Sequence, residues 1–238
     1  NRNVLANRFA IMGLEREALS IRIPPKVFTL MLLGRHEDAL SHARTIVADK
    51  PENKRYRSYL GRVLISTGHA EEARSLLEEA WFNNGQRVTR SVVFSPGDAA
   101  ALIAILRATG EEPQVVELVE AMEENTRRLK EAGIIGDGNL LSTDFIEGLT
   151  LYMSNQQKHG LALISKAVEN GYFIPPAKFY PQALYDDPGF APILEKQEAN
   201  QARERNRFLS IICADNPYQE VWQPEKGTCE QFDFREGT

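Results

Sequence analysis

The chain has 238 residues, with 28 Lys and Arg against 33 Asp and Glu, and a formal net charge of −5. A hydrophobic share of 42%, with 16 Gly and 12 Pro, is ordinary for a globular protein and excludes collagen-like, mucin-like and largely disordered chains. The net negative charge argues against a nucleic-acid-binding surface over most of the molecule. The longest apolar run near the middle, residues 99–106, is far shorter than the roughly 20 residues that a membrane span needs.

The chain begins with Asn1, no secretory signal follows, and we expect it to be a piece of a longer protein. Residues 1–19 are predicted to form one lead helix. The last helix is expected to have Asp187 as its cap and Pro188 in its first turn. The only strand-like run is residues 90–94, so an all-α fold is expected. Apolar periodicity predicts the other helices over 26–34, 36–49, 53–67, 70–83, 97–109, 112–132, 141–154 and 157–170, and the last over 188–210.

A repeat of 34 residues organises the first half of the chain. Gly34 and Gly68 lie 34 residues apart, and so do Ala39 and Ala73. In each unit the Gly suits the end of a first helix, where a left-handed residue is often needed, and the Ala lets a second helix pack closely. Gly61, seven residues before Gly68, is expected to let the two helices of its unit approach each other.

Two weaker units follow. Gly110 ends the apolar helix of the third unit, and Asn155, which tolerates the left-handed conformation, replaces the Gly of the fourth. The spacing resembles that of the tetratricopeptide-repeat (TPR) family. The resemblance implies a right-handed superhelix, an α-solenoid of antiparallel helix pairs with a C-terminal capping segment. The predicted units are 20–53, 54–87, 96–129 and 141–174, and a cap with an irregular tail occupies 175–238.

The segment over about 160–194 carries a second resemblance. Gly171 and Tyr172 close the last unit, and an Asp-Pro-x-Phe sequence follows at 187–190. This looks like the end of C-terminal TPR segments in bacterial signalling and transcription-regulator proteins. The resemblance implies a sensory or protein-interaction region, rather than the part of such a protein that binds DNA or catalyses a reaction.

The tail contains a polar run and both cysteines of the chain. Residues 197–207 form either a solvated helix face or a helix that docks a partner. Cys213 and Cys229 lie 16 residues apart, and a bridge between them would remove roughly 3 kcal/mol of unfolded-state entropy. A bridge would indicate an oxidising compartment such as the periplasm, whereas two free thiols would indicate the cytoplasm.

The sequence offers no catalytic constellation. His36 and Glu37 begin like a zinc-protease motif, but Leu40 stands where the second His must be. Neighbouring carboxylates such as Glu123 and Glu124 diverge on a helix and do not converge on one reacting atom. We therefore expect no enzyme, no metal site and no cofactor.

A binding surface is the remaining candidate. In TPR arrays the first helix of each unit lines a concave face, and by this resemblance Arg55, Arg62, Arg107 and Tyr152 face it, with Tyr59 beside them. Arginines pair with carboxylates and rings stack on apolar side chains, so these residues suit an extended or acidic peptide. Alternatively, the arginines are merely solvated.

These observations favour a non-catalytic protein-interaction or sensory domain of a larger bacterial signalling protein, which binds a peptide or protein segment in a concave groove. One alternative is a scaffold that self-associates into a homo-oligomer through the ends of the solenoid. Another is a small-molecule sensor with a pocket between the last repeat and the tail. Protein partners are expected, and neither nucleic acid nor a membrane span is expected for this segment.

Overall fold

The computed structural model describes residues 2–21, 27–83, 86–87, 96–132, 142–174, 180–217, 219–220, 223–224 and 227–230. Besides turns and loops, this part consists of helices and of two short strands, β1 (Phe82–Asn83) and β2 (Gln86–Arg87), which pair antiparallel. The predicted strand-like run 90–94 lies outside the described residues. The helices are α1 (Arg2–Ile11), α2 (Glu15–Ser20), α3 (Val27–Leu32), α4 (His36–Asp49), α5 (Lys54–Ser66), α6 (Ala70–Trp81), α7 (Pro96–Ala108), α8 (Glu112–Glu131), α9 (Thr143–Met153), α10 (Gln157–Glu169), α11 (Gln182–Tyr185) and α12 (Ala191–Ala214).

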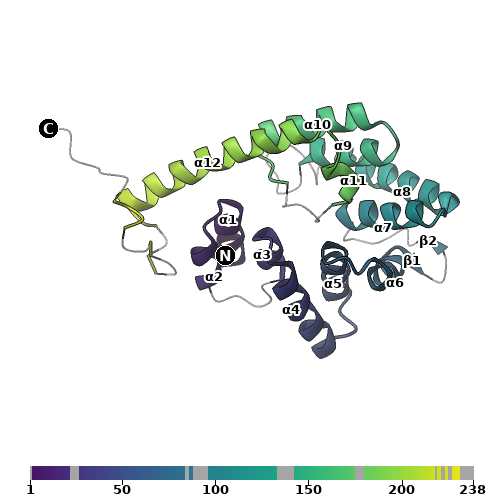
Figure 1. The fold of residues 1–238 in the computed structure, drawn as a ribbon, viewed down its shortest axis with the longest axis horizontal. Coiled ribbons are helices and arrows are strands. Elements are labelled where there is room, and N and C mark those ends of the chain that lie inside the picture. Colours follow the sequence, from purple (N-terminus) through teal and green to yellow (C-terminus); the bar gives the residue numbers. More distant parts are fainter. Residues whose placement is uncertain are drawn as a thin grey trace.

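From α3 to α10 each helix packs against the next one in the chain, and α1 packs against α2 (Figure 1). The pairs α3–α4, α5–α6 and α9–α10 lie within the predicted units 20–53, 54–87 and 141–174, and α7–α8 begins in the unit 96–129 and extends two residues beyond it. Helix α5 also packs against α7, and α7 against α9, so the first helices of successive units lie in a row. The right-handed superhelical course and the capping role of the C-terminal segment remain predictions.

The turns inside the helix pairs share one backbone geometry. Gly68 has φ +83°, and His69 N–H donates to the Leu64 carbonyl at 2.8 Å, a bond that closes the end of α5. Asn155, with φ +63°, occupies the same place between α9 and α10, which confirms the prediction from its residue type. Gly61 is also confirmed as a close approach, because a Cβ there would lie 3.2 Å from Leu77 Cδ2.

The predicted single lead helix over 1–19 is wrong. Two helices, α1 and α2, form there and pack on each other, because Gly13 adopts φ +71° and ends α1 with the turn seen in the repeats. Leu14 N–H donates to the Phe9 carbonyl at 2.9 Å, and Ala18, five residues after Gly13, is fully buried. The Gly and Ala at this spacing were the available signal for a further helix pair.

The last helix also begins later than predicted. Helix α12 starts at Ala191 with Pro192 in its first turn, and it extends to Ala214. Asp187 does not cap it, because its carboxylate instead accepts a hydrogen bond from Gly189 N–H at 2.8 Å and closes the preceding turn. Pro188 therefore lies in this turn rather than in the helix.

Helix α12 joins two hydrophobic clusters. Its first half packs on α10, and its last turns reach α1, where the Phe208 and Phe9 rings meet edge to face at 5.5 Å (Figure 1). Leu209 and Ile212 belong to this smaller cluster, whereas the main cluster is built from side chains of every helix from α3 to α10 and includes Ile193 of α12. The two ends of the described chain are therefore held together by one helix.

The polar run within α12 is only partly solvated. Gln197 is buried, and its side chain accepts from Ile174 N–H at 2.6 Å and donates to the Ile174 carbonyl at 2.9 Å. Residues 202–207 are exposed. Cys213, in the last turn of α12, forms a disulfide with Cys229, with their Cα atoms 5.4 Å apart. Among the described residues, no helix is both long and apolar enough to cross a membrane.

Candidate functional site

The first helices of the repeat units present a common surface, which we call the inner face. It is defined by Ser58, Tyr59 and Arg62 of α5, Asp98 of α7, and Phe145 and Tyr152 of α9. Three of the five predicted binding residues belong to it. Arg55, a fourth, is in the first turn of α5, and its side chain lies outside the described part of the chain.

Arg62 forms a buried ion pair. Its Nη2 donates to Asp98 Oδ2 at 3.2 Å, its Nε donates to Oδ1, and the two side chains are 15% and 6% exposed. Ser58 Oγ donates to the same carboxylate at 2.6 Å. Burial alone would lower the pKa of Arg62, but the Asp98 carboxylate more than offsets this and raises it. This arginine therefore joins α5 to α7 and does not project into solvent.

Arg107 joins α7 to α9. Its Nη2 donates to the carbonyl oxygen of Met153 at 2.5 Å. Met153 is the last residue of α9, where carbonyl groups have no partner within the helix. The guanidinium therefore serves the end of a neighbouring helix, and its positive charge also suits the negative end of that helix.

Tyr152 contacts the C-terminal part of the chain. Its hydroxyl donates to the Ala183 carbonyl at 3.0 Å and to the Asp187 carboxylate at 3.1 Å. Burial, followed by the hydrogen bond to Asp187, raises the pKa of Tyr152 to about 12. This predicted ligand contact is therefore already occupied by another segment of the same chain.

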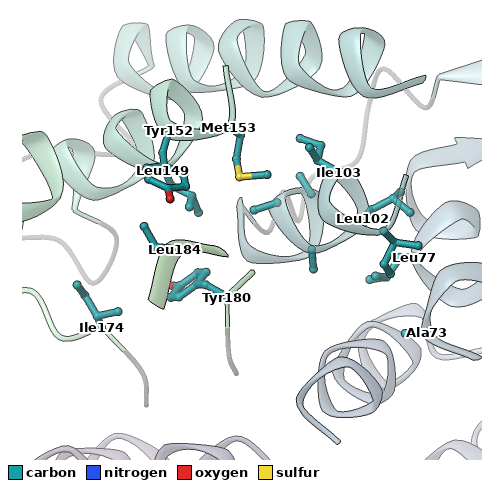
Figure 2. Close-up of a cluster of buried hydrophobic side chains, with 14 of the residues drawn as sticks. Ala73, Leu77, Leu102, Ile103, Leu149, Tyr152, Met153, Ile174, Tyr180 and Leu184 are labelled. Carbon is teal, nitrogen blue, oxygen red and sulfur yellow. The ribbon is translucent and has the colours of Figure 1, made fainter. Parts of the chain in front are cut away.

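The rest of this segment covers the inner face at α7 and α9. The Phe145 ring stacks on Tyr172 at 4.4 Å between centroids and meets Tyr180 at 5.1 Å. Figure 2 shows Leu184 and Tyr180 next to Leu149 and Tyr152 within one buried cluster. We call residues 180–190 the covering segment. Its side chains fill the part of the inner face that the sequence predicted to be a groove.

Tyr59 lies at the α5 end of the inner face. Its side chain is half-buried and packs against the main hydrophobic cluster. Tyr59 lies four residues after position 55 and three before Arg62, so the three positions share one side of the helix. The half-buried ring leaves part of its surface accessible at this end of the inner face.

Sequence reasoning missed Asp98 and the covering segment. Asp98 is the one acidic residue of α7, and it lies 36 residues after Arg62, close to one repeat length. The sequence does contain a signal for this ion pair: a single acidic residue on an otherwise apolar helix, about one repeat length after an arginine predicted to face the same side. The contacts of Tyr180 and Leu184 have no comparable pattern, because they depend on where the chain returns after α10.

A cavity of about 450 Å³ lies on the other side of the C-terminal segment, between α1, α3 and α12. Its walls are mainly apolar, with Ile11, Leu33, Phe173 and Leu194 half-buried, and the exposed carboxylate of Glu198 lies at its rim. Among the described residues, no group of three or more His, Cys, Asp or Glu side chains is arranged to hold a metal ion. The cavity therefore offers an apolar surface and an acidic edge.

Comparison with protein families gives one match. Residues 30–90 match the family model described as a tetratricopeptide repeat, which covers α4, α5, α6 and the α5 part of the inner face. The chain had no match among curated proteins or among solved structures. Tetratricopeptide repeats generally mediate protein–protein interaction and are typically non-enzymatic. The match shows that residues 30–90 are similar to a tetratricopeptide repeat.

Proposed function

We propose that this chain is a non-catalytic protein-interaction module that binds a peptide or protein segment of a partner on the inner face, at its α5 end. One observation carries the proposal. The same face, at α7 and α9, already holds a peptide segment through a side-chain contact to its backbone, from Tyr152 to the Ala183 carbonyl. A row of helices that holds one segment in this way has the shape and the donors to hold another beside it.

The chemistry of the α5 end favours a partner with an acidic residue beside an apolar or aromatic one. Tyr59 offers a half-buried ring, and position 55 supplies a positive charge one helical turn away. Arg62 and Arg107 contribute indirectly, because each fixes the position of a neighbouring helix. Position 55 and Tyr59 are thus the residues expected to contact the partner.

The experiment is a selection of binders from a random-peptide display library on the immobilised full chain. Peptides that bind the wild type are expected to bind at least about tenfold more weakly when Arg55→Glu and Tyr59→Ala are combined. Arg203→Glu, a charge reversal on the exposed part of α12, is the matched control and is expected to leave affinity unchanged. An empty selection, or peptides that bind the double variant as well as the wild type, would overturn the proposal.

The setting proposed for this module is a bacterial signalling protein in an oxidising compartment such as the periplasm. The Cys213–Cys229 bridge supports the compartment, because disulfides persist where the surroundings are oxidising. Quantifying cysteine modification in protein isolated from cells under thiol-blocking conditions tests this. Free thiols at both positions would contradict it.

A second candidate function is the sensing of a small molecule in the cavity between α1, α3 and α12. The volume of about 450 Å³ is within the range of ligand pockets, and an apolar wall with Glu198 at the rim suits an organic cation with an apolar body. Leu33→Trp would fill part of the cavity. Amines that raise the melting temperature of the wild type are expected to lose this effect in the variant, and an equal effect in both proteins would refute a site there.

A further inference from the structure

Residues 180–187 occupy the inner face as a bound peptide would. Tyr180, Leu184 and Asp187 point their side chains to the face, and α11 between them brings them to one side. We infer that these residues are an internal ligand of the inner face and that a partner competes with them for this surface. The partner carries the same three contact residues, which we call anchors: an aromatic residue, a leucine four positions later and a carboxylate three positions after the leucine. This inference rests on the proposed function and extends the contacts of the partner along the inner face, from its α5 end to α9.

Each anchor has a defined receptor. Tyr180 is 6% exposed, and its ring lies 5.1 Å from that of Phe145. Leu184 is fully buried in the main cluster. The Asp187 carboxylate accepts a hydrogen bond from the Tyr152 hydroxyl at 3.1 Å. An aromatic pocket, an apolar slot and a hydroxyl donor together form a site that selects both shape and charge.

The side chains between the anchors make the segment resemble a ligand rather than a core helix. Gln182 and Ala183 are exposed, and the Gln182 amide bonds only within the segment, to Asp186 at 2.8 Å, among the contacts described for it. The face contacts the backbone at the Ala183 carbonyl, which any residue at that position would present. Recognition therefore depends on three side chains and one carbonyl group.

Helix α12 is held by contacts that do not involve residues 180–187. Ile174 is fixed by two hydrogen bonds to the Gln197 side chain, at 2.6 and 2.9 Å, and Asn200 Nδ2 donates to the Val168 carbonyl of α10 at 2.9 Å. Phe190, by contrast, meets the Tyr185 ring edge to face at 5.5 Å. Residues 180–187 can therefore leave the face while α12 stays in place. Because the tether gives these residues a high effective concentration, they suppress the binding of a similar peptide added in solution.

The experiment uses the full chain and a fluorescent synthetic peptide of residues 180–190. Leu184→Asp in the protein removes the central anchor from the internal ligand and leaves its receptor intact. The peptide is expected to bind this variant at least about tenfold more tightly than the wild type, measured by fluorescence anisotropy. Ile211→Asp is the control, because the Ile211 side chain on α12 is close in size to that of Leu184 but is 52% exposed. The peptide is expected to bind this control with the affinity that it has for the wild type.

A peptide that itself carries Leu184→Asp is expected not to bind the variant protein. Equal affinity of the unmodified peptide for wild type and variant, or no binding to either, would overturn the inference. Should the Leu184→Asp protein lack the helical circular dichroism of the wild type, Leu184→Ala replaces it with the same expectations.

The library selection separates this inference from the proposed function. Selected peptides that lack the three anchors, and that the 180–190 peptide does not displace from Leu184→Asp protein, would refute the inference and leave the proposed function standing. Tight binding of the 180–190 peptide to the variant, with an empty selection on the wild type, would support the inference and refute the proposed function.

Discussion

The ion pair between Arg62 and Asp98 gives the sharpest test of how the inner face is built. Arg62→Met removes the charge and keeps much of the side-chain volume, but it leaves a carboxylate that is 6% exposed without its arginine, while the Ser58 hydroxyl still donates to it. Breaking a buried ion pair in this way costs about 3–5 kcal/mol, because the remaining charge stays buried without its ionic partner. We therefore expect the free energy of unfolding to fall by about this amount.

The assay is urea unfolding followed by circular dichroism and by intrinsic fluorescence, since coincident transitions are needed for a two-state free energy. Arg44→Ala is the matched control, because its ion pair with Glu72 is about half exposed and is expected to contribute about 0–1 kcal/mol. The double variant Arg62→Met with Asp98→Leu is expected to recover at least half of the loss. A loss below about 1 kcal/mol for Arg62→Met alone would show that this arginine is not structural, and would restore it as a direct ligand contact.

Three further predictions test other contacts. Gly160→Ala would place a Cβ 2.7 Å from Tyr152 N, so a loss of about 1–3 kcal/mol is expected in urea unfolding, and an unchanged midpoint would refute so tight a contact between α9 and α10. Because burial and Asp187 raise the pKa of Tyr152 from 10.0 to about 12, its contribution to stability is complete below pH 10 and is lost as pH rises towards 12. Tyr152→Phe is expected to flatten this alkaline decline, and an equal decline in the variant would contradict the assignment. Thiol titration of the denatured, unreduced protein is expected to find no free thiol at Cys213 or Cys229, and two free thiols would disprove the bridge.

Local patterns predicted much of the helical framework. The spacing of Gly34 and Gly68 predicted where two helices end, and both residues have a positive φ there. The lead segment shows how such a prediction fails. Gly13 and Ala18 have the same spacing as the repeat residues, yet the apolar pattern on both sides of Gly13 resembles one continuous helix. The three residues between α1 and α2 interrupt that pattern too briefly to be recognised from periodicity alone.

The candidate site was predicted less completely. Arg62, Arg107 and Tyr152 lie on or beside the inner row of helices, but each has a partner within the chain. In the sequence, an arginine that binds an acidic peptide cannot be told from an arginine that pairs with Asp98 inside the chain. Which of these holds depends on burial, which the sequence pattern of one helix does not specify.

The sequence alone therefore determined the helix pairs from α3 to α10 and their turns, since a positive-φ residue and an apolar stripe act over a few residues of one segment. Only the tertiary structure decided what the inner face contacts. Its decisive bonds join residues 36, 46 and 35 positions apart, from Arg62 to Asp98, from Arg107 to Met153 and from Tyr152 to Asp187. Bonds across such distances form only when whole helices have packed, because their geometry depends on the position of every element between the two residues.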